Sequence, residues 1–178
     1  VGSEMCIRDR PGRSALRERQ ASARAARTHA QLVQCLRAHD VQLGTLRTLA
    51  WKGVPGALRP VVWQLLLGYL PTSSAARRAT LARKRAEYAE GVERAFARGS
   101  AGLDQAIWHQ IYIDVPRTNP GIRLWQQAVT QRALERILYV WAIRHPVSGY
   151  VQGINDLATP LFEVFLSCLL YTCPSPRD

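Results

Sequence analysis

Apolar residues along this chain recur every three or four positions, the spacing that places them on one face of a helix. Leu43, Leu46 and Leu49 show this spacing before Trp51, where we expect a packed domain to begin. No stretch alternates apolar and polar residues as a strand does, and no segment repeats. We therefore predict an all-α, multi-helix fold. The predicted helices cover residues 14–37, 55–66, 75–97, 103–111, 123–144 and 154–166.

The predicted helices differ in how much apolar surface they offer. Residues 14–37 contain no Gly or Pro but carry only a weak apolar stripe, which predicts a solvent-exposed leader or linker helix. Residues 75–97 are amphipathic, whereas 123–144 carry the widest stripe and should form a central core helix. Pro160 lies inside the last apolar run and predicts a kink or a late helix start there.

Two loop segments should each present a polar side chain. Pro116 disfavours the helical region for Val115, so we expect Val115 to be extended and Arg117 to leave a loop rather than a helix face. Gly149 and Gly153 lie just after a predicted helix end and allow the backbone between them to approach another surface closely.

Arg117 and Gln152 are the candidate chemical groups of these loops. An always-charged, planar guanidinium beside a neutral amide is suited to stabilising a phosphoryl-transfer transition state and positioning its attacking water. On the residues alone, two structural roles compete with this interpretation. Arg117 could form an ion pair with Asp114 that closes a turn, and Gln152 could bind the backbone where the next helix begins.

Three short motifs carry a family resemblance. Arg59-Pro-Val-Val-Trp63, Ile111-Tyr-Ile-Asp-Val-Pro-Arg117 and Tyr150-Val-Gln-Gly153 occur in this order. They resemble the RxxxW, IxxDxxR and YxQG motifs of the TBC domain, which activates the GTPase activity of Rab proteins. The resemblance runs from about Leu49 to about Leu166. The segments IYIDVPRTNP and WAIRHPVSGYVQGINDL are similar to those of a subgroup whose members work at the Golgi.

The resemblance implies a role for each motif residue. Arg117 would be an arginine finger, and Gln152 would act in trans in place of the partner's own water-positioning glutamine. Asp114 would hold the guanidinium or the loop in place before the partner binds. The supporting positions that it implies are Tyr150, Gly153 and Asn155 beside the glutamine, and Arg59, Trp63, Ile111 and Gly149 in the fold.

The same resemblance names the partner. The chain has no Gly-rich phosphate loop ending in Lys-Ser or Lys-Thr, so we expect no hydrolase activity of its own and no cofactor of its own. GTP and Mg²⁺ would be carried by a Rab-family small GTPase. The alternative is a non-catalytic module of the same fold that recruits Rab GTPases or membrane adaptors. The implied location is cytoplasmic, with peripheral association at Golgi membranes for the subgroup.

The net charge of +11 is unevenly distributed. Residues 1–50 carry nine Arg and four acids, residues 51–100 nine Lys plus Arg and three acids, and the remainder six of each. A basic surface attracts nucleic acid, anionic lipid or acidic proteins. A solvated helix face is the simpler interpretation, and without nucleic-acid-binding motifs we expect no nucleic-acid partner. No apolar run reaches the 18 or so residues of a transmembrane helix.

Cysteine and histidine spacing predicts no metal or redox site. Both residue types are scattered, at Cys6, Cys35, Cys168 and Cys173 and at His29, His39, His109 and His145. His145 precedes Pro146, where we expect a helix to end.

The two end segments do not resemble parts of a folded domain. VGSEMCIRDR and CLLYTCPSPRD are similar to translated adapter sequence, so we expect a fragment of a longer protein. The TBC domain also continues beyond its YxQG motif. The expected division is an artefactual leader at 1–10, a basic helical linker at 11–42, a partial TBC domain at 43–167 and an artefactual tail at 168–178.

Overall fold

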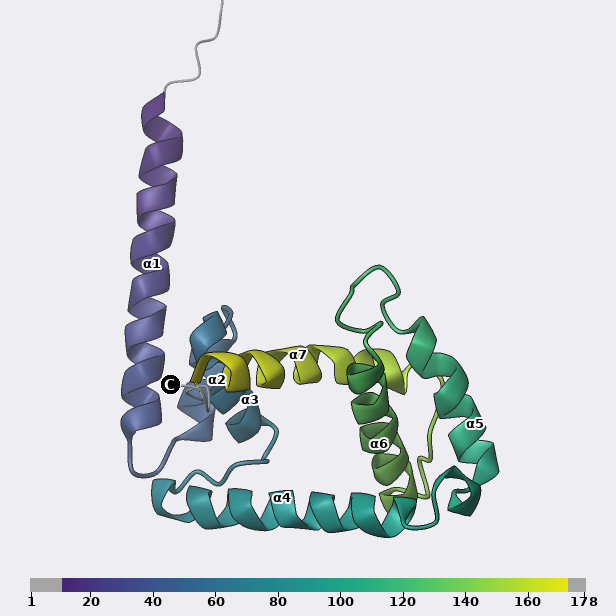
Figure 1. Ribbon diagram of the computed structural model, residues 1–178. Coiled ribbons are helices and arrows are strands. Elements are labelled where there is room, and N and C mark those ends of the chain that lie inside the picture. Colours follow the sequence, from purple (N-terminus) through teal and green to yellow (C-terminus); the bar gives the residue numbers. More distant parts are fainter. Residues whose placement is uncertain (1–10, 173–178) are drawn as a thin grey trace, which may run out of the picture. The chain divides into compact units, whose positions relative to one another are not determined.

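The computed structural model describes residues 11–172, and its helices confirm the all-α fold (Figure 1). The chain divides into two compact units, residues 1–77 and residues 78–178, which are described separately. The expected leader at 1–10, the last residues of the expected tail at 173–178, and with them Cys6 and Cys173, lie outside the described residues. Within 11–172 the β-structure is a single isolated bridge, and no helix there is long and apolar enough to cross a bilayer.

The first unit is built on a long helix, α1 (Pro11–Arg37), which extends well past its neighbour α2 (Leu43–Ala50). The end of α1 packs against α2, and α2 packs against α3 (Arg59–Leu66). A 3₁₀ turn, Gly56–Leu58, precedes α3. Residues 15–27 are all exposed, which confirms the solvent-exposed helix for this part of α1. The buried apolar side chains of this unit are Leu32, Val41, Leu46, Val62, Leu65 and Leu70.

Arg59 and Trp63 lie one turn apart on α3, where a guanidinium could stack on an indole, but the Arg59 side chain binds the backbone instead. The Nε–H of Arg59 donates to the carbonyl of Val54 at 3.1 Å, and Trp63 is half-buried. Arg59 therefore ties the turn before α3 to the first residue of that helix. A backbone carbonyl within reach is a better partner for one N–H than a ring face, because it satisfies a directional hydrogen bond.

The second unit places α6 (Ala128–Arg144) between its neighbours, and so confirms it as the central core helix. α6 packs against α5 (Gln105–Asp114) and α7 (Ile154–Thr172), and Arg144 donates to the Glu87 carbonyl of α4 (Ser74–Phe96) at 2.8 Å. A 3₁₀ turn, Ser100–Gly102, lies between α4 and α5. The buried apolar side chains of this core are Leu103, Ile111, Val115, Trp125, Leu134, Leu138, Tyr139, Ala142 and Tyr150.

Two helix starts differ from the prediction because of nonlocal contacts and capping. α5 begins at Gln105 rather than at residue 103, since the Asp104 carboxylate accepts hydrogen bonds from the Ala106 and Ile107 amides and so caps the helix. α6 begins at Ala128 rather than at residue 123. The residues before it form successive turns that bury Trp125, whose Nε1–H donates to Glu163 at 3.2 Å.

Pro160 lies inside α7, and of the two predicted outcomes, a kink or a late start, the late start is wrong because the helix already begins at Ile154. A proline at this position leaves the carbonyl four residues earlier, that of Asp156, without its amide donor. The Thr159 hydroxyl donates to that carbonyl at 2.9 Å. The side chain of the neighbouring residue thus replaces the lost backbone hydrogen bond and lets the helix continue.

Candidate functional site

The arginine loop follows α5 directly, and its backbone is helical rather than extended. Val115 has φ −58° and ψ −47°, and Val115–Arg117 form a 3₁₀ turn before Thr118 becomes extended. The predicted extended Val115 is therefore wrong. Val115 is fully buried in the core, and its amide donates to Ile111 at the end of α5, so packing outweighs the local bias of a residue before proline. Arg117 still lies where the turn ends and is exposed.

The glutamine loop follows α6, which ends at Arg144 with His145 as its C-cap, as predicted. Gly149 has φ +58° and Gly153 has φ +99°, backbone conformations that cost little only for glycine. The Gly153 amide donates to Asn155 Oδ1 at 3.1 Å. Tyr150 is buried between these glycines and Gln152 is exposed. The loop therefore anchors one side chain in the core and directs another outwards.

A network of buried hydrogen bonds joins the two loops. The Tyr150 hydroxyl donates to Asp114 Oδ2 at 2.9 Å and lies 3.4 Å from Asn155 Oδ1. The Nδ2 of Asn155 donates to Thr118 Oγ1 at 2.9 Å, and that hydroxyl donates to the Asp114 carbonyl at 3.2 Å. Asp114, Thr118 and Asn155 are all buried. The end of α5, the residue after Arg117, the glutamine loop and the start of α7 are thus held in one arrangement.

The network keeps the Tyr150 hydroxyl protonated. Burial of the ring raises the pKa of Tyr150 above its usual value of 10.0, and the hydrogen bond to Asp114 raises it further. The negative charges of Asp114 and Asp156 act in the same direction. A phenol that remains neutral is a permanent donor to Asp114 near neutral pH.

Arg117 and Gln152 line one open cavity of about 470 Å³. Its remaining lining residues are Gln110, Ile113, Asp114, Tyr150 and Val151. Among the residues whose side chains the structure describes, no ion pair includes Arg117, so the alternative of an Asp114–Arg117 pair is not observed. Asp114 binds Tyr150 instead. The cavity therefore presents a guanidinium that forms no ion pair with Asp114, together with an exposed amide.

A comparison with the profiles of known families matches residues 56–174 to the Rab-GTPase-TBC domain. The chain belongs to this family. The structure is similar to the crystal structure of the Ypt/Rab-GAP domain of Gyp1p, with a TM-score of 0.74 and 46% identity over 82% of this chain and 45% of that one.

Curated relatives of this TBC domain include proteins named as GTPase activators. The chain is 59% identical over 129 residues to GTPase-activating protein gyp1 of Schizosaccharomyces pombe, which covers 71% of this chain and 25% of the relative. It is 52% identical over 134 residues to TBC1 domain family member 22B of Homo sapiens, which covers 75% of this chain and 26% of the relative. The chain thus spans about a quarter of the length of these relatives.

The TBC motif residues predicted from the sequence do not all lie at the cavity. Four of them line it, namely Asp114, Arg117, Tyr150 and Gln152. Gly153 and Asn155 do not line it but are joined by a hydrogen bond beside the glutamine loop. Three further motif residues have other places: Ile111 is fully buried in the core of the same unit, and Arg59 and Trp63 belong to the first unit. Gly149 provides the positive φ at the start of the glutamine loop.

Three residues of this TBC site were missed by the sequence reasoning. Thr118 belongs to none of the three motifs, although its position directly after Arg117 is a signal that it could support that residue. Gln110 and Ile113 line the cavity from α5. Gln110, Ile113, Asp114 and Arg117 are spaced at three, one and three, so the helical period continued through the turn would have placed them on one side.

The described residues provide no metal-binding group for this TBC domain. Nowhere in that part of the chain do three His, Cys, Asp or Glu side chains gather as a metal site requires. Arg117 and Gln152 also contribute no carboxylate. A guanidinium and an amide can bind phosphate oxygens and water.

Proposed function

We propose that this chain carries the catalytic loops of a Rab GTPase activator and accelerates GTP hydrolysis by a Rab-family GTPase. The observation that carries the proposal is the common cavity lined by Arg117 and Gln152, both exposed and both backed by the buried network. The partner would supply GTP and Mg²⁺, and this chain would supply an arginine finger and a glutamine that acts in place of the partner's own.

Arg117 would act on the charge that develops as the γ-phosphate leaves. Its guanidinium offers forked N–H donors to the oxygens between the β- and γ-phosphates, where negative charge increases in the transition state. An arginine finger contributes roughly a thousand- to a hundred-thousand-fold in rate, or about 4 to 7 kcal/mol. That magnitude exceeds what an exposed ion pair contributes to stability, about 1 kcal/mol or less.

Gln152 would position the attacking water. Its amide can accept a hydrogen bond from the water through the carbonyl oxygen and donate one to a phosphate oxygen through the nitrogen. The glycines on either side of Tyr150 and Gln152 allow the loop to direct this amide outwards while Tyr150 fixes its base. The network would thereby limit the entropy lost when the partner binds.

The test is single-turnover GTP hydrolysis by a panel of Rab proteins with the chain and its Arg117→Ala variant. Arg85→Ala is the matched control, because Arg85 is exposed on α4 and does not line the cavity. We expect stimulation that the Arg117 variant loses and the Arg85 variant keeps. Stimulation that survives Arg117→Ala would contradict the arginine-finger role.

A second measurement separates catalysis from recruitment. Aluminium fluoride bound with GDP mimics the transferring phosphoryl group, and groups that act only in the transition state strengthen that complex selectively. We expect the chain to bind the GDP–aluminium fluoride form of its Rab more tightly than the GTP form, with the difference lost in Arg117→Ala. Equal binding of both forms without stimulation would favour the non-catalytic recruiting module. The Golgi subgroup stays a prediction, and the Rab that responds would test it.

A further inference from the structure

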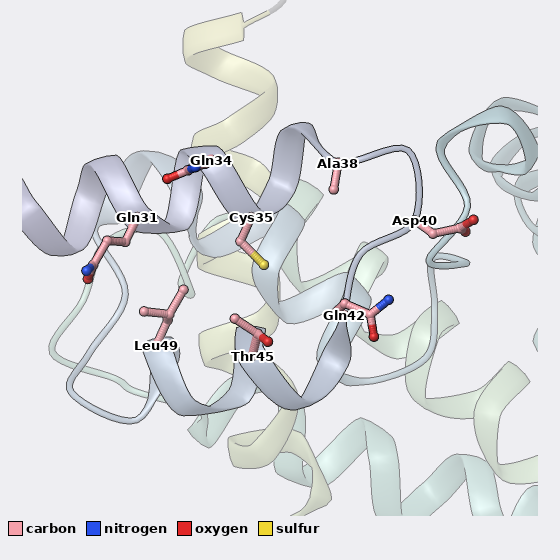
Figure 2. Close-up of a pocket in the computed structure, with 8 residues that line it drawn as sticks. All are labelled: Gln31, Gln34, Cys35, Ala38, Asp40, Gln42, Thr45 and Leu49. Carbon is pink, nitrogen blue, oxygen red and sulfur yellow. The ribbon is translucent and has the colours of Figure 1, made fainter.

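The first unit contains a second, larger cavity that the proposed GTPase chemistry does not use. It measures about 1030 Å³ and lies along α1, the end of α2 and the turn that leads to α3. It adjoins a smaller cavity of about 370 Å³, with which it shares Gln31 and Leu49 (Figure 2). We refer to the larger cavity as the basic groove. Its lining residues are Ala21, Arg24, Ala25, Arg27, Thr28, Gln31, Thr48, Leu49, Lys52, Gly53, Val54, Pro55 and Arg59.

The charges that line the basic groove all have one sign. Arg24 and Arg27 come from α1, Lys52 from the turn after α2 and Arg59 from α3, and no Asp or Glu lines the groove. All four cations are exposed, and none takes part in an ion pair within the residues that the structure describes. Arg59 uses its Nε–H on Val54, which leaves its two terminal amino groups as donors.

The surrounding sequence does not neutralise this charge. Residues 15–59 contain eight Arg and Lys but only two acids, Glu18 and Asp40. Asp40 lies 3.5 Å from His39 and lines the smaller cavity instead. Like charges close together repel one another, and an anionic partner bound between them would relieve this repulsion.

The floor of the groove is apolar and made of small side chains. Ala21, Ala25 and Thr28 follow at spacings of four and three on α1, so they lie on one face of that helix. Leu49, Val54 and Pro55 form the opposite wall. Small side chains allow another helix to approach closely, and the cations at the rim would then meet acidic residues on its sides.

We propose that the basic groove docks an acidic, amphipathic peptide segment of a partner protein, which lies along α1 with its apolar side on the alanine floor. A concave groove suits a peptide better than a lipid surface, because a bilayer is broad and flat and cannot reach the floor. Figure 2 shows Cys35 of α1 directed towards Thr45 of α2, with Gln31 and Leu49 at the end of the cavity where it adjoins the basic groove. The smaller cavity adjoins the basic groove with neutral polar groups and the acidic Asp40 in its lining, so the acidic part of the peptide is expected at the Arg24–Arg27 end.

The proposal is independent of the GTPase-activating function, because none of its residues lines the cavity of Arg117 and Gln152. The probe is a fluorescein-labelled peptide of about 18 residues with Glu and Leu at helical spacing, long enough for a helix of about 27 Å. Its neutral counterpart has Gln in place of every Glu. Binding to the 178-residue chain is measured by fluorescence anisotropy at about 50 mM and about 300 mM salt.

Two triple variants of equal charge distinguish binding in the basic groove from attraction by the net charge of the chain. The groove variant carries Arg24→Gln, Arg27→Gln and Lys52→Gln, and the control carries Arg17→Gln, Arg19→Gln and Arg47→Gln, which are exposed but do not line the groove. An exposed ion pair changes an affinity roughly two- to threefold, so the groove variant should bind the acidic peptide roughly tenfold more weakly. The control should change it by less than about twofold, because its charges act only at a distance.

A steric variant tests the floor without changing charge. Ala25→Leu adds volume to an exposed position of the groove and should weaken binding of the acidic peptide while leaving the unfolding transition unchanged. Equal loss in both triple variants, equal binding of the neutral peptide, or no effect of Ala25→Leu would each overturn the proposal. Vesicles of phosphatidylcholine and phosphatidylserine serve as the competing probe, and binding to them without binding to the peptide would assign the basic groove to a lipid surface instead.

Discussion

The arginine loop and the glutamine loop each present one polar side chain to the same cavity, but their backbone conformations differ. The arginine loop remains in helical conformations and is stiffened by Pro116. The glutamine loop leaves the helical region at Gly149 and Gly153 and is held by side-chain hydrogen bonds of Tyr150. The first should therefore tolerate backbone substitutions, whereas the second should depend on its glycines and its buried anchor.

The largest expected effect is on the arginine loop's functional group. Arg117→Lys keeps the charge but loses the forked donors, so we expect the rate of stimulated GTP hydrolysis to fall by about a thousandfold or more. Stability should change little because Arg117 is exposed. Single-turnover rates beside a thermal melt would check both statements. A lysine variant that keeps a tenth of the activity or more would show that charge alone is sufficient.

The corresponding change in the glutamine loop should be smaller. Gln152→Ala removes the amide that we propose positions the water but leaves the cation, and misplacing a reacting group costs about a hundredfold. Gln127→Ala is the control, since Gln127 is exposed and its side chain makes no capping hydrogen bond. If Gln152→Ala abolished activity as fully as Arg117→Lys, the two loops would not have separable roles.

Tyr150→Phe tests the anchor of the glutamine loop. It removes the donor to buried Asp114, which should lower the free energy of unfolding by about 1 to 3 kcal/mol. Because the pKa of Tyr150 is raised in the folded protein, the contribution of its hydroxyl to the free energy of unfolding is fully present below about pH 10. This contribution is lost as the pH rises further. Denaturant titrations at pH about 8 and about 10.5 should therefore show a smaller difference between wild type and variant at the higher pH. A difference that grows with pH would contradict this sign.

The glycines of the glutamine loop should not tolerate a side chain. A Cβ added at Gly153 would have no atom within 4 Å, so Gly153→Ala is strained only by the backbone φ of +99°. We expect it to lower the free energy of unfolding by about 1 to 2 kcal/mol. Gly44→Ala is the matched control: it also meets nothing within 4 Å, but it lies in α2 and should be neutral or stabilising by up to about 1 kcal/mol. Chemical denaturation of both variants gives the comparison, and equal effects would mean that the glycine conformation is not limiting.

The smallest effect is expected in the stiff loop. Pro116→Ala leaves a residue that adopts helical conformations easily, and Pro116 is exposed. The loss of chain restraint should lower stability by only about 0.4 to 1 kcal/mol, with GTPase stimulation nearly unchanged. A large loss of activity in this variant would show that the proline itself positions Arg117.

The sequence was sufficient for the helices and for the signals that end them. The apolar spacing located α4 and the end of α6 closely, and His145 and the two glycines marked the glutamine loop correctly. These features depend on residues close together in the chain, where periodicity and turn chemistry apply. The motif order also led to the family that the comparisons confirm.

What the sequence could not provide depends on contacts between distant residues. Val115 is helical because it is buried, although the proline after it favours an extended backbone. Thr118 and Asn155 are 37 positions apart, and only the fold brings them within hydrogen-bond distance. The same holds for the partner of Asp114: local spacing suggested Arg117, whereas the structure gives Tyr150.

The Thr118 hydroxyl both donates and accepts, and this constrains how the site can change in evolution. It accepts from Asn155 and donates to the Asp114 carbonyl, so valine at 118 would remove the acceptor of one Asn155 N–H and the side-chain donor to that carbonyl, while the Nδ2 of Asn155 keeps its hydrogen bond to Asp156 Oδ1 at 3.3 Å. An apolar residue at 155 would remove the first of these penalties but would take the acceptor from the Gly153 amide, so the costs of the two substitutions should not add. Positions 118 and 155 are therefore expected to covary among homologues, although neither contributes a catalytic group.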